Sequence, residues 1–256
     1  MNCGKCCGTA GSQWAIIDAV VDVLLYWGVI FLSEVDAVRG SDTNDYPIHY
    51  SSRHWPGEGS FAMKFIVRQC LRQMVRSITW RGRCGALHIF QRGPVLGNHS
   101  NIYIIGIHVA HGDLQIDTLS DIAFLLRHRP WGSRVLVAGD WNIDQLPSLA
   151  IDPFSDHPGR DQHHQAERVL VQSLVDRFHL SLFVPEVVCS TPGGPFDDAC
   201  RASPITRIPV GEAASYCSPS LLDYAAASEN LVTESHIHWH GVPADHALVT
   251  FSISPV

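Results

Sequence analysis

The sequence predicts a layered α/β fold, built as a single domain over residues 1–256. Apolar runs typical of buried strands alternate along the chain with segments of helical periodicity, which is the pattern of layered α/β proteins. Hydrophobic residues make up 46% of the chain and charged residues only 17%. This composition supplies a sizeable core and does not predict disorder for any large part of the chain.

The first elements are a helix, a strand and a long loop. Apolar residues at helical spacing follow Trp14, with acidic residues on the opposite face, and predict an amphipathic helix. Gly28 ends this helix, and the apolar residues 29–32 predict a short buried strand that leads directly to Glu34. Residues 40–60 are rich in Gly, Pro, Ser, Asp and His, so we expect them to form a long loop.

The middle of the chain offers three strands and two helices. We expect strands over 77–80 ("SITW"), over 86–90 ("ALHIF") and at the start of 101–113 ("NIYIIGIHVAHGD"). The spacing of apolar residues in 63–75 ("MKFIVRQCLRQMV") favours a helix, and 114–129 carries a helical stripe that a proline ends.

The last part continues the alternation. We expect a buried strand over 134–140 ("RVLVAGD") and an amphipathic helix over 161–180. Residues 183–220, with their Pro, Gly and Ser, predict a long irregular region. Two late strands are expected within 221–228 ("LLDYAAAS") and 246–253 ("HALVTFSI").

Composition limits the possible partners and compartments. The 18 Lys and Arg against 25 Asp and Glu argue against a protein that holds nucleic acid by a broad basic field, although a bound metal could supply local positive charge. The opening "CGKCC" lacks the second ligand pair of a zinc site, so reduced thiols are favoured for the eight cysteines. Acidic residues interrupt the apolar stretch after Trp14, and no signal-peptide pattern is found, so we expect an intracellular protein without a membrane span.

The stretch "VLVAGDWNID", residues 135–144, is the most informative one. Asp140 and Asn142 follow a buried strand at alternate positions and would point the same way. A carboxylate beside an amide suits a phosphate and a hard cation. The alternative is a simple turn, because Asp, Asn and Gly are common turn residues after a strand.

Comparable polar residues recur at the ends of other predicted strands. Ligands and catalytic groups of α/β folds gather at such positions, so their recurrence favours a site over turn chemistry. The residues are Glu34, His108, Asp140 with Asn142, Asp223, and Asp245 with His246.

The order and wording of these pieces resemble the endonuclease/exonuclease/phosphatase superfamily, including its deoxyribonuclease, apurinic-endonuclease and retrotransposon-endonuclease branches. The matching pieces are "LSEVD", "IHVAHGDLQIDTL", "GDWNID", "LDYAAAS" and "ADHALV". The resemblance implies a four-layered α/β/β/α sandwich with two packed mixed sheets. Only "MNCG" stands where the family has its first strand, so this strand is expected to be truncated.

The resemblance also implies a divalent metal. Glu34 is the expected principal ligand, with Asn2 and Asp245 beside it. Oxygen ligands of this kind suit Mg²⁺ or Mn²⁺.

The remaining residues are expected to carry the chemistry of phosphodiester cleavage. His246 would take a proton from the attacking water, and Asp223 would orient its other ring nitrogen. Asp140 would position the nucleophile or share in metal binding, and Asn142 would donate to a phosphoryl oxygen. His108 would either add a second hydrogen bond or protonate the leaving group.

Three further features have less certain roles. Glu58 either pairs with His108, as a carboxylate does in the deoxyribonucleases, or is a solvated loop residue. "RGRCG", residues 81–85, either contacts phosphate or forms a polar hairpin turn. For "HIHWH", residues 236–240, we reject a metal site because no carboxylate of matching register accompanies the alternate histidines.

The sequence thus predicts a Mg²⁺-dependent phosphodiesterase, and most specifically an endonuclease with a nucleic-acid substrate. A nuclease is favoured over a phosphatase because "IHVAHGD" is closest to the deoxyribonuclease form. A phosphatase, or a phosphodiesterase acting on phospholipid or inositol phosphate, is the alternative within the superfamily. A catalytically silent relative that serves as a binding module is the alternative outside enzymes.

Overall fold

The computed structural model of the chain describes residues 28–36, 48–51, 61–93, 99–112, 114–145, 158–185, 206–207, 220–238 and 246–254. The helix expected after Trp14 lies outside these residues. The elements are β1 (Val29–Asp36), β2 (Ile48–Ser51), β3 (Phe61–Val67), the 3₁₀-helix η1 (Gln69–Met74), β4 (Val75–Arg81), β5 (Cys84–Arg92), β6 (His99–His108), α2 (Leu114–Arg127), β7 (Arg134–Asp140), α3 (Pro158–Arg177), β8 (Ser181–Phe183), β9 (Asp223–Ala227), β10 (Val232–His238) and β11 (Leu248–Ile253).

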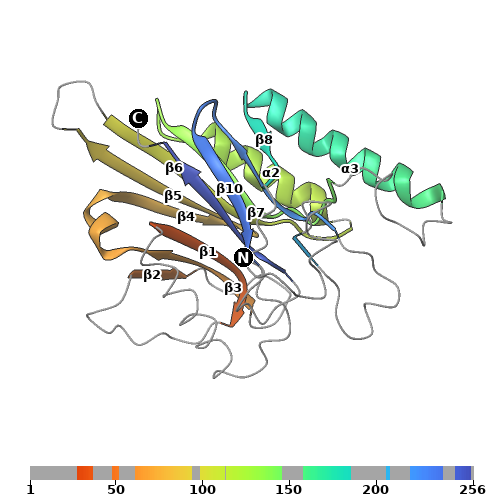
Figure 1. Cartoon of the computed structure of the whole chain (residues 1–256), viewed down its shortest axis with the longest axis horizontal. Coiled ribbons are helices and arrows are strands. Elements are labelled where there is room, and N and C mark those ends of the chain that lie inside the picture. The colour runs from red at the N-terminus through yellow and green to blue at the C-terminus, as the bar shows by residue number, and fades with distance from the viewer. Residues whose placement is uncertain are drawn as a thin grey trace.

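A six-stranded mixed sheet is the centre of the molecule (Figure 1). Its strand order is β4-β5-β6-β7-β9-β8, and β6 and β7 form its parallel pair. Because a parallel pair needs a long crossover connection, α2 lies between these two strands in the sequence. The apolar runs of β6 and β7 reflect burial on both faces, as in parallel sheets generally.

Helices cover one face of this sheet. Ile105 and Ile107 of β6 pack with Ile122 and Leu126 of α2 in the largest core cluster, to which α3 contributes Val171. Figure 1 shows α2 and α3 side by side over this face. The amphipathic periodicity of both segments therefore identified true helices.

Further strands cover the other face. β1, β3 and β2 form a three-stranded antiparallel sheet, whose Phe65 packs against Ile102 and Ile104 of β6. β10 and β11 form an antiparallel pair that packs on Leu136 of β7. The prediction of a mixed α/β fold with a second sheet facing the first is confirmed, and the described strand pairs outside the large sheet are all antiparallel.

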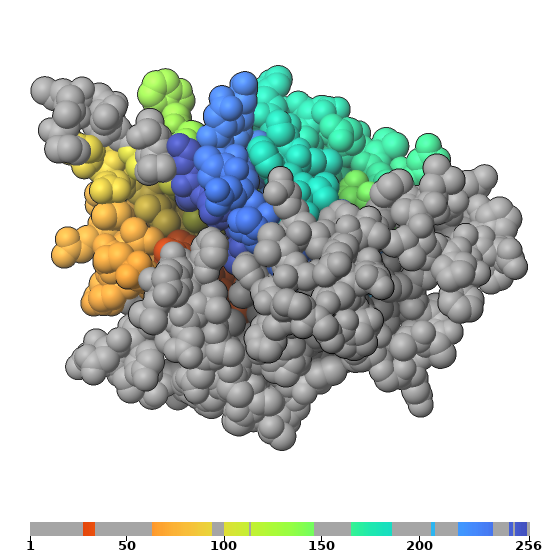
Figure 2. All heavy atoms as spheres, in the orientation of Figure 1, coloured from red at the N-terminus to blue at the C-terminus, as the bar shows by residue number. Residues whose placement is uncertain are grey.

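β10 also lies at the edge of the large sheet. Figure 2 shows its residues (blue) beside those of β8 and α3 (teal) on the surface. The Ser235 hydroxyl donates to the Val184 carbonyl, with an oxygen–oxygen distance of 3.5 Å. Neither α2 nor α3 has an apolar stretch of the length that a bilayer span requires.

Two predictions of secondary structure were wrong. Residues 63–75 are not one helix: Met63 to Val67 belong to β3, and η1 follows. β3 pairs with β1 on one side and β2 on the other, and this pairing, with its buried side chains, outweighs the helical spacing of the apolar residues. The loop expected over 40–60 contains β2, a strand of four residues.

Candidate active site

Three of the predicted site residues lie at one edge of the large sheet because of strand register. β6 ends at His108 and β7 at Asp140, and these two residues are partners in the parallel ladder. Asp140 is in turn the antiparallel partner of Asp223, the first residue of β9. All three side chains are buried. The edge where three strands begin or end therefore places an imidazole and two carboxylates together.

The glycine before Asp140 permits this close arrangement. Gly139 has φ of +144°, a backbone conformation that side-chain-bearing residues rarely adopt. A Cβ at this position would collide with the carbonyl oxygen of Ile107 on β6. The glycine before Asp140 is thus required by the β6–β7 contact.

His246 joins the cluster through a hydrogen bond to Asp223. Its Nδ1 lies 2.7 Å from Oδ2 of Asp223, and both side chains are buried. Its Nε2 lies 4.0 Å from Oδ2 of Asp140. The predicted His–Asp pair is therefore present, with the second ring nitrogen turned toward the carboxylate at the end of β7.

Thr206 supports the Asp223 side. Its buried hydroxyl oxygen accepts hydrogen bonds from the backbone N–H groups of Leu222 and Asp223, each at 2.9 Å. Its carbonyl accepts from the N–H of Ala247 at 2.7 Å. One residue thus links the start of β9 to the segment that carries His246.

The Trp between Asp140 and Asn142 anchors the turn in the core. Trp141 stacks on Tyr224 with ring centroids 5.2 Å apart and an interplanar angle of 6°. Its Nε1 donates to the Tyr224 carbonyl at 3.0 Å. The indole therefore satisfies its donor while burying its rings, as buried Trp residues usually do.

Asn142 fixes the geometry around Asp140. It adopts φ of +50°, which Asn tolerates better than most residues, and its backbone N–H donates to Oδ1 of Asp140 at 2.9 Å. Its Nδ2 donates to the carbonyl of Val109, just after β6, at 2.7 Å. The turn interpretation of this stretch is therefore right, and the turn orients the Asp140 carboxylate, while the role of Asn142 toward a phosphoryl oxygen stays a prediction.

His108 has a partner that the sequence did not identify. Nη1 of Arg83 lies 3.1 Å from Nδ1 of His108, and the His108 N–H donates to the Arg83 carbonyl at 3.1 Å. Nε2 of His108 lies 3.6 Å from Oδ2 of Asp140. Arg83 belongs to "RGRCG", which forms the two-residue turn between β4 and β5, so the hairpin interpretation was right and the contact with His108 was missed.

Two arginines and a buried carboxylate act on His111 at this end of the site. His111, although exposed, has a pKa lowered chiefly by partial desolvation; Asp140 raises this pKa, and His108, Arg207 and Arg83 lower it. Arg83 and Arg207 therefore lie within electrostatic range of His111, as Asp140 does.

Known proteins share this architecture. No family model and no curated protein matches the sequence. The fold is similar to an endonuclease/exonuclease/phosphatase family protein from Leptotrichia buccalis C-1013-b, with 15% identity over 99% of this chain and 97% of that one, and a TM-score of 0.58. It is also similar to an AP endonuclease from Archaeoglobus fulgidus, with 12% identity, a TM-score of 0.58, and coverage of 93% and 95%.

The chain has the endonuclease/exonuclease/phosphatase superfamily fold. A functionally unknown conserved protein from Enterococcus faecalis V583 shares it, with 13% identity, a TM-score of 0.53, and coverage of 95% of this chain and 91% of that one. The resemblance inferred from five short motifs is therefore confirmed at the level of the fold.

Of the three predicted metal ligands, only Glu34 lies among the residues that the structure describes. Glu34 lies in β1, where the register with β3 shifts between Leu32 and Val35. Such an irregularity is typical of positions near sites. Asn2, Asp245 and the possible His108 partner Glu58 lie outside the described residues.

The described side chains offer a cation a place to bind. Asp140, Asp223 and His246 each present a ligand atom, and these atoms all lie within 4.8 Å of one another. Oδ1 of Asp223 is buried and accepts no hydrogen bond from any described residue. A buried carboxylate oxygen without a donor is costly, so this atom fits a bound cation. Within the described part of the chain, no other His, Cys, Asp and Glu side chains form such a group.

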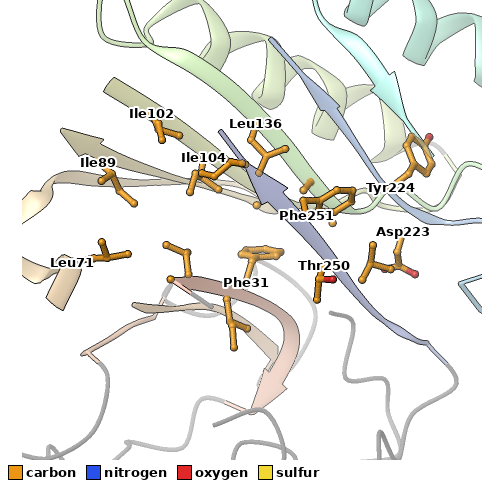
Figure 3. A pocket seen from close by; sticks show the side chains of 18 of the residues that line it. Phe31, Leu71, Ile89, Ile102, Ile104, Leu136, Asp223, Tyr224, Thr250 and Phe251 are labelled. Carbon is orange, nitrogen blue, oxygen red and sulfur yellow. The ribbon is translucent and has the colours of Figure 1, made fainter. Parts of the chain in front are cut away.

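An apolar cavity of about 360 Å³ lies between the two sheets and ends at this site. Figure 3 shows Phe31 of β1 on one side of the cavity and Ile104 and Leu136 of the large sheet on the other; Phe251 of β11 also lines it. Asp223 lines one end. The site thus has a polar mouth and an apolar space behind it.

Proposed function

We propose that the protein is a divalent-metal-dependent phosphodiesterase that hydrolyses nucleic-acid phosphodiester bonds as an endonuclease. The observation that carries this proposal is the buried His246–Asp223 pair, whose second ring nitrogen faces Asp140 at the strand ends. This combination provides a base, a group that orients the base, and a carboxylate beside both. The same groups would be costly to bury for stability alone.

His246 acts as the general base in this mechanism. Asp223 accepts a hydrogen bond from Nδ1–H, so the neutral ring carries its lone pair on Nε2. Nε2 takes a proton from water while the water oxygen bonds to phosphorus, and the bond from phosphorus to the leaving oxygen breaks. Asp223 stabilises the imidazolium that forms, and burial of the pair strengthens this interaction.

Asp140 and Asp223 would hold the metal, together with Glu34, Asn2 and Asp245 if these residues reach the site. Oxygen ligands favour Mg²⁺ or Mn²⁺ over softer metals. When bound, such an ion neutralises charge on the phosphoryl oxygens. Asn142 keeps the Asp140 carboxylate oriented through its backbone N–H.

Nucleic acid is the proposed partner because the cationic groups are local. The cationic side chains Arg83 and Arg207 lie within electrostatic range of His111, as the Asp140 carboxylate does, in a chain of net charge −7. Phosphate groups of a backbone would find donors there, while the rest of the surface would not retain nucleic acid at high salt.

A phospholipid phosphodiesterase is the second candidate, supported by the cavity between the sheets. Its lining is mostly apolar and it reaches Asp223, so an acyl chain could occupy it with the phosphate at the site.

A substrate panel separates these functions. Purified protein is incubated with supercoiled plasmid, phospholipid vesicles or p-nitrophenyl phosphate, each with Mg²⁺ and then with EDTA. We expect plasmid nicking that EDTA abolishes and that Asp140→Ala and His246→Ala lack. Cleavage of vesicles alone would support the second candidate, and p-nitrophenyl phosphate alone a phosphatase. No metal-dependent cleavage of any substrate, with the protein folded, would favour a silent binding module.

A further inference from the structure

Two histidines present the same ring nitrogen to one oxygen. Nε2 of His108 lies 3.6 Å, and Nε2 of His246 4.0 Å, from Oδ2 of Asp140. Both rings are buried. Their environments differ at the opposite nitrogen, because Nδ1 of His246 meets a carboxylate and Nδ1 of His108 meets a guanidinium.

The chemistry of these partners assigns the ring protons. An ionised carboxylate only accepts hydrogen bonds, so Nδ1 of His246 carries a proton, and in the neutral ring the lone pair is then on Nε2. A guanidinium only donates, so Nδ1 of His108 must offer its lone pair to Arg83. The proton of the neutral His108 ring then resides on Nε2, facing Asp140.

The sheet holds Arg83 in this position. The backbone N–H of His108 donates to the Arg83 carbonyl, and the ladder of β5 and β6 starts at the next pair, Cys84 and Ile107. Arg83 is half-buried in its hairpin turn. The guanidinium and the imidazole therefore stay together through backbone pairing rather than through their own contact alone.

We propose that Arg83 is a positioning residue that fixes the tautomer of the His108 imidazole, with the ring proton on Nε2. In this form Nδ1 of His108 is held by Arg83, and Nε2 is the atom that donates to a phosphoryl or leaving oxygen. The assignment identifies the donor atom for both of the roles that the sequence left open for His108. The role toward substrate depends on the proposed phosphodiesterase function, whereas the tautomer does not.

Long-range ¹H–¹⁵N NMR of the histidine rings tests the proposal directly. The spectra are recorded on metal-free, ¹⁵N-labelled protein, and the signals are assigned by their loss in His108→Gln and His246→Gln. We expect opposite patterns, with the proton on Nε2 in His108 and on Nδ1 in His246. Two protonated nitrogens in His108, or a proton on its Nδ1, would overturn the proposal.

A neutral histidine ring in water also carries its proton mainly on Nε2. Variants of Arg83 are therefore needed to distinguish a tautomer fixed by Arg83 from the one that a free imidazole prefers. Arg83→Glu replaces a donor by an acceptor, so the proton should move to Nδ1; Arg83→Lys should keep the original pattern. The matched control is Arg92→Glu, which makes the same charge change at an exposed position at the far end of β5. An unchanged His108 pattern in folded Arg83→Glu would contradict the proposal.

Arg83→Met serves if Arg83→Glu does not fold. Without a donor at Nδ1, the two His108 nitrogens should shift toward values averaged over exchanging tautomers, and kcat on plasmid should fall about tenfold through the weaker donor. A wild-type spectrum in Arg83→Met would refute the positioning role. A different outcome would refute only the proposed function: wild-type protein that cleaves no substrate, but whose ring proton is on Nε2 in His108 and on Nδ1 in His246. The positioning role of Arg83 would then still hold.

Discussion

Asp140 has a histidine on each side, and the two histidines have partners of opposite charge. On one side His246 is bound to Asp223, which Thr206 and β9 hold in place. On the other side His108 is bound to Arg83, which a hairpin turn holds in place. The comparison shows that residue type alone does not define a role, because the partner of Nδ1 decides whether Nε2 accepts or donates.

The strongest test of this difference is the loss of the base. His246→Gln should lower kcat on plasmid about 10³-fold, as much as His246→Ala, because an amide cannot take a proton from water. Nicking rates at saturating Mg²⁺ measure the effect. His128→Gln, at an exposed position on the end of α2, is the matched control and should keep wild-type rates. Substantial activity in His246→Gln would remove His246 from the role of base.

His108 should respond differently from His246 to substitution by glutamine. His108→Gln should lower kcat only about tenfold, whereas His108→Ala should lower it about 10²-fold, because a glutamine amide can replace an N–H donor. The ratio of the two rates, measured in the plasmid assay, is the informative quantity. Equal losses in both variants would mean that His108 transfers a proton or has only a structural role.

The smallest expected effect concerns Thr206, which supports Asp223, and it is an effect on stability. Thr206→Val removes the acceptor of two buried backbone N–H groups, so the free energy of unfolding should fall by about 2 kcal/mol. Urea denaturation followed by circular dichroism measures this change. Thr79→Val, at an exposed position on the edge strand β4, is the matched control and should stay within about 0.5 kcal/mol of wild type. An equally small change in Thr206→Val would show that water or another group replaces the hydroxyl.

Much of the site could be predicted because its residues follow local signals. The apolar runs before His108 and Asp140, and at the start of 221–228, identified strands, and polar residues at their ends were expected to converge. The structure brings together His108, Asp140, Asn142, Asp223 and His246, as that expectation required. The metal-binding roles of Glu34, Asn2 and Asp245 stay predictions.

Other features of the fold and the site could not be predicted from the local sequence pattern. β3 has apolar spacing that also fits a helix, and only its pairing with β1 and β2 makes it a strand. Arg83 lies 25 residues before His108, in a segment whose composition suggested a phosphate contact or a polar hairpin turn but no contact with a histidine. Pairing between distant segments decides such contacts, and a single sequence does not encode them in any local period.

The sequence by itself determined the alternation of strands and helices and which polar residues end the strands, because both depend on the local spacing of apolar residues. Only the tertiary structure decided that Nδ1 of one histidine meets Asp223 and that of the other meets Arg83. These contacts join residues 23 and 25 positions apart. They depend on strand register and turn placement, which the whole folded chain fixes.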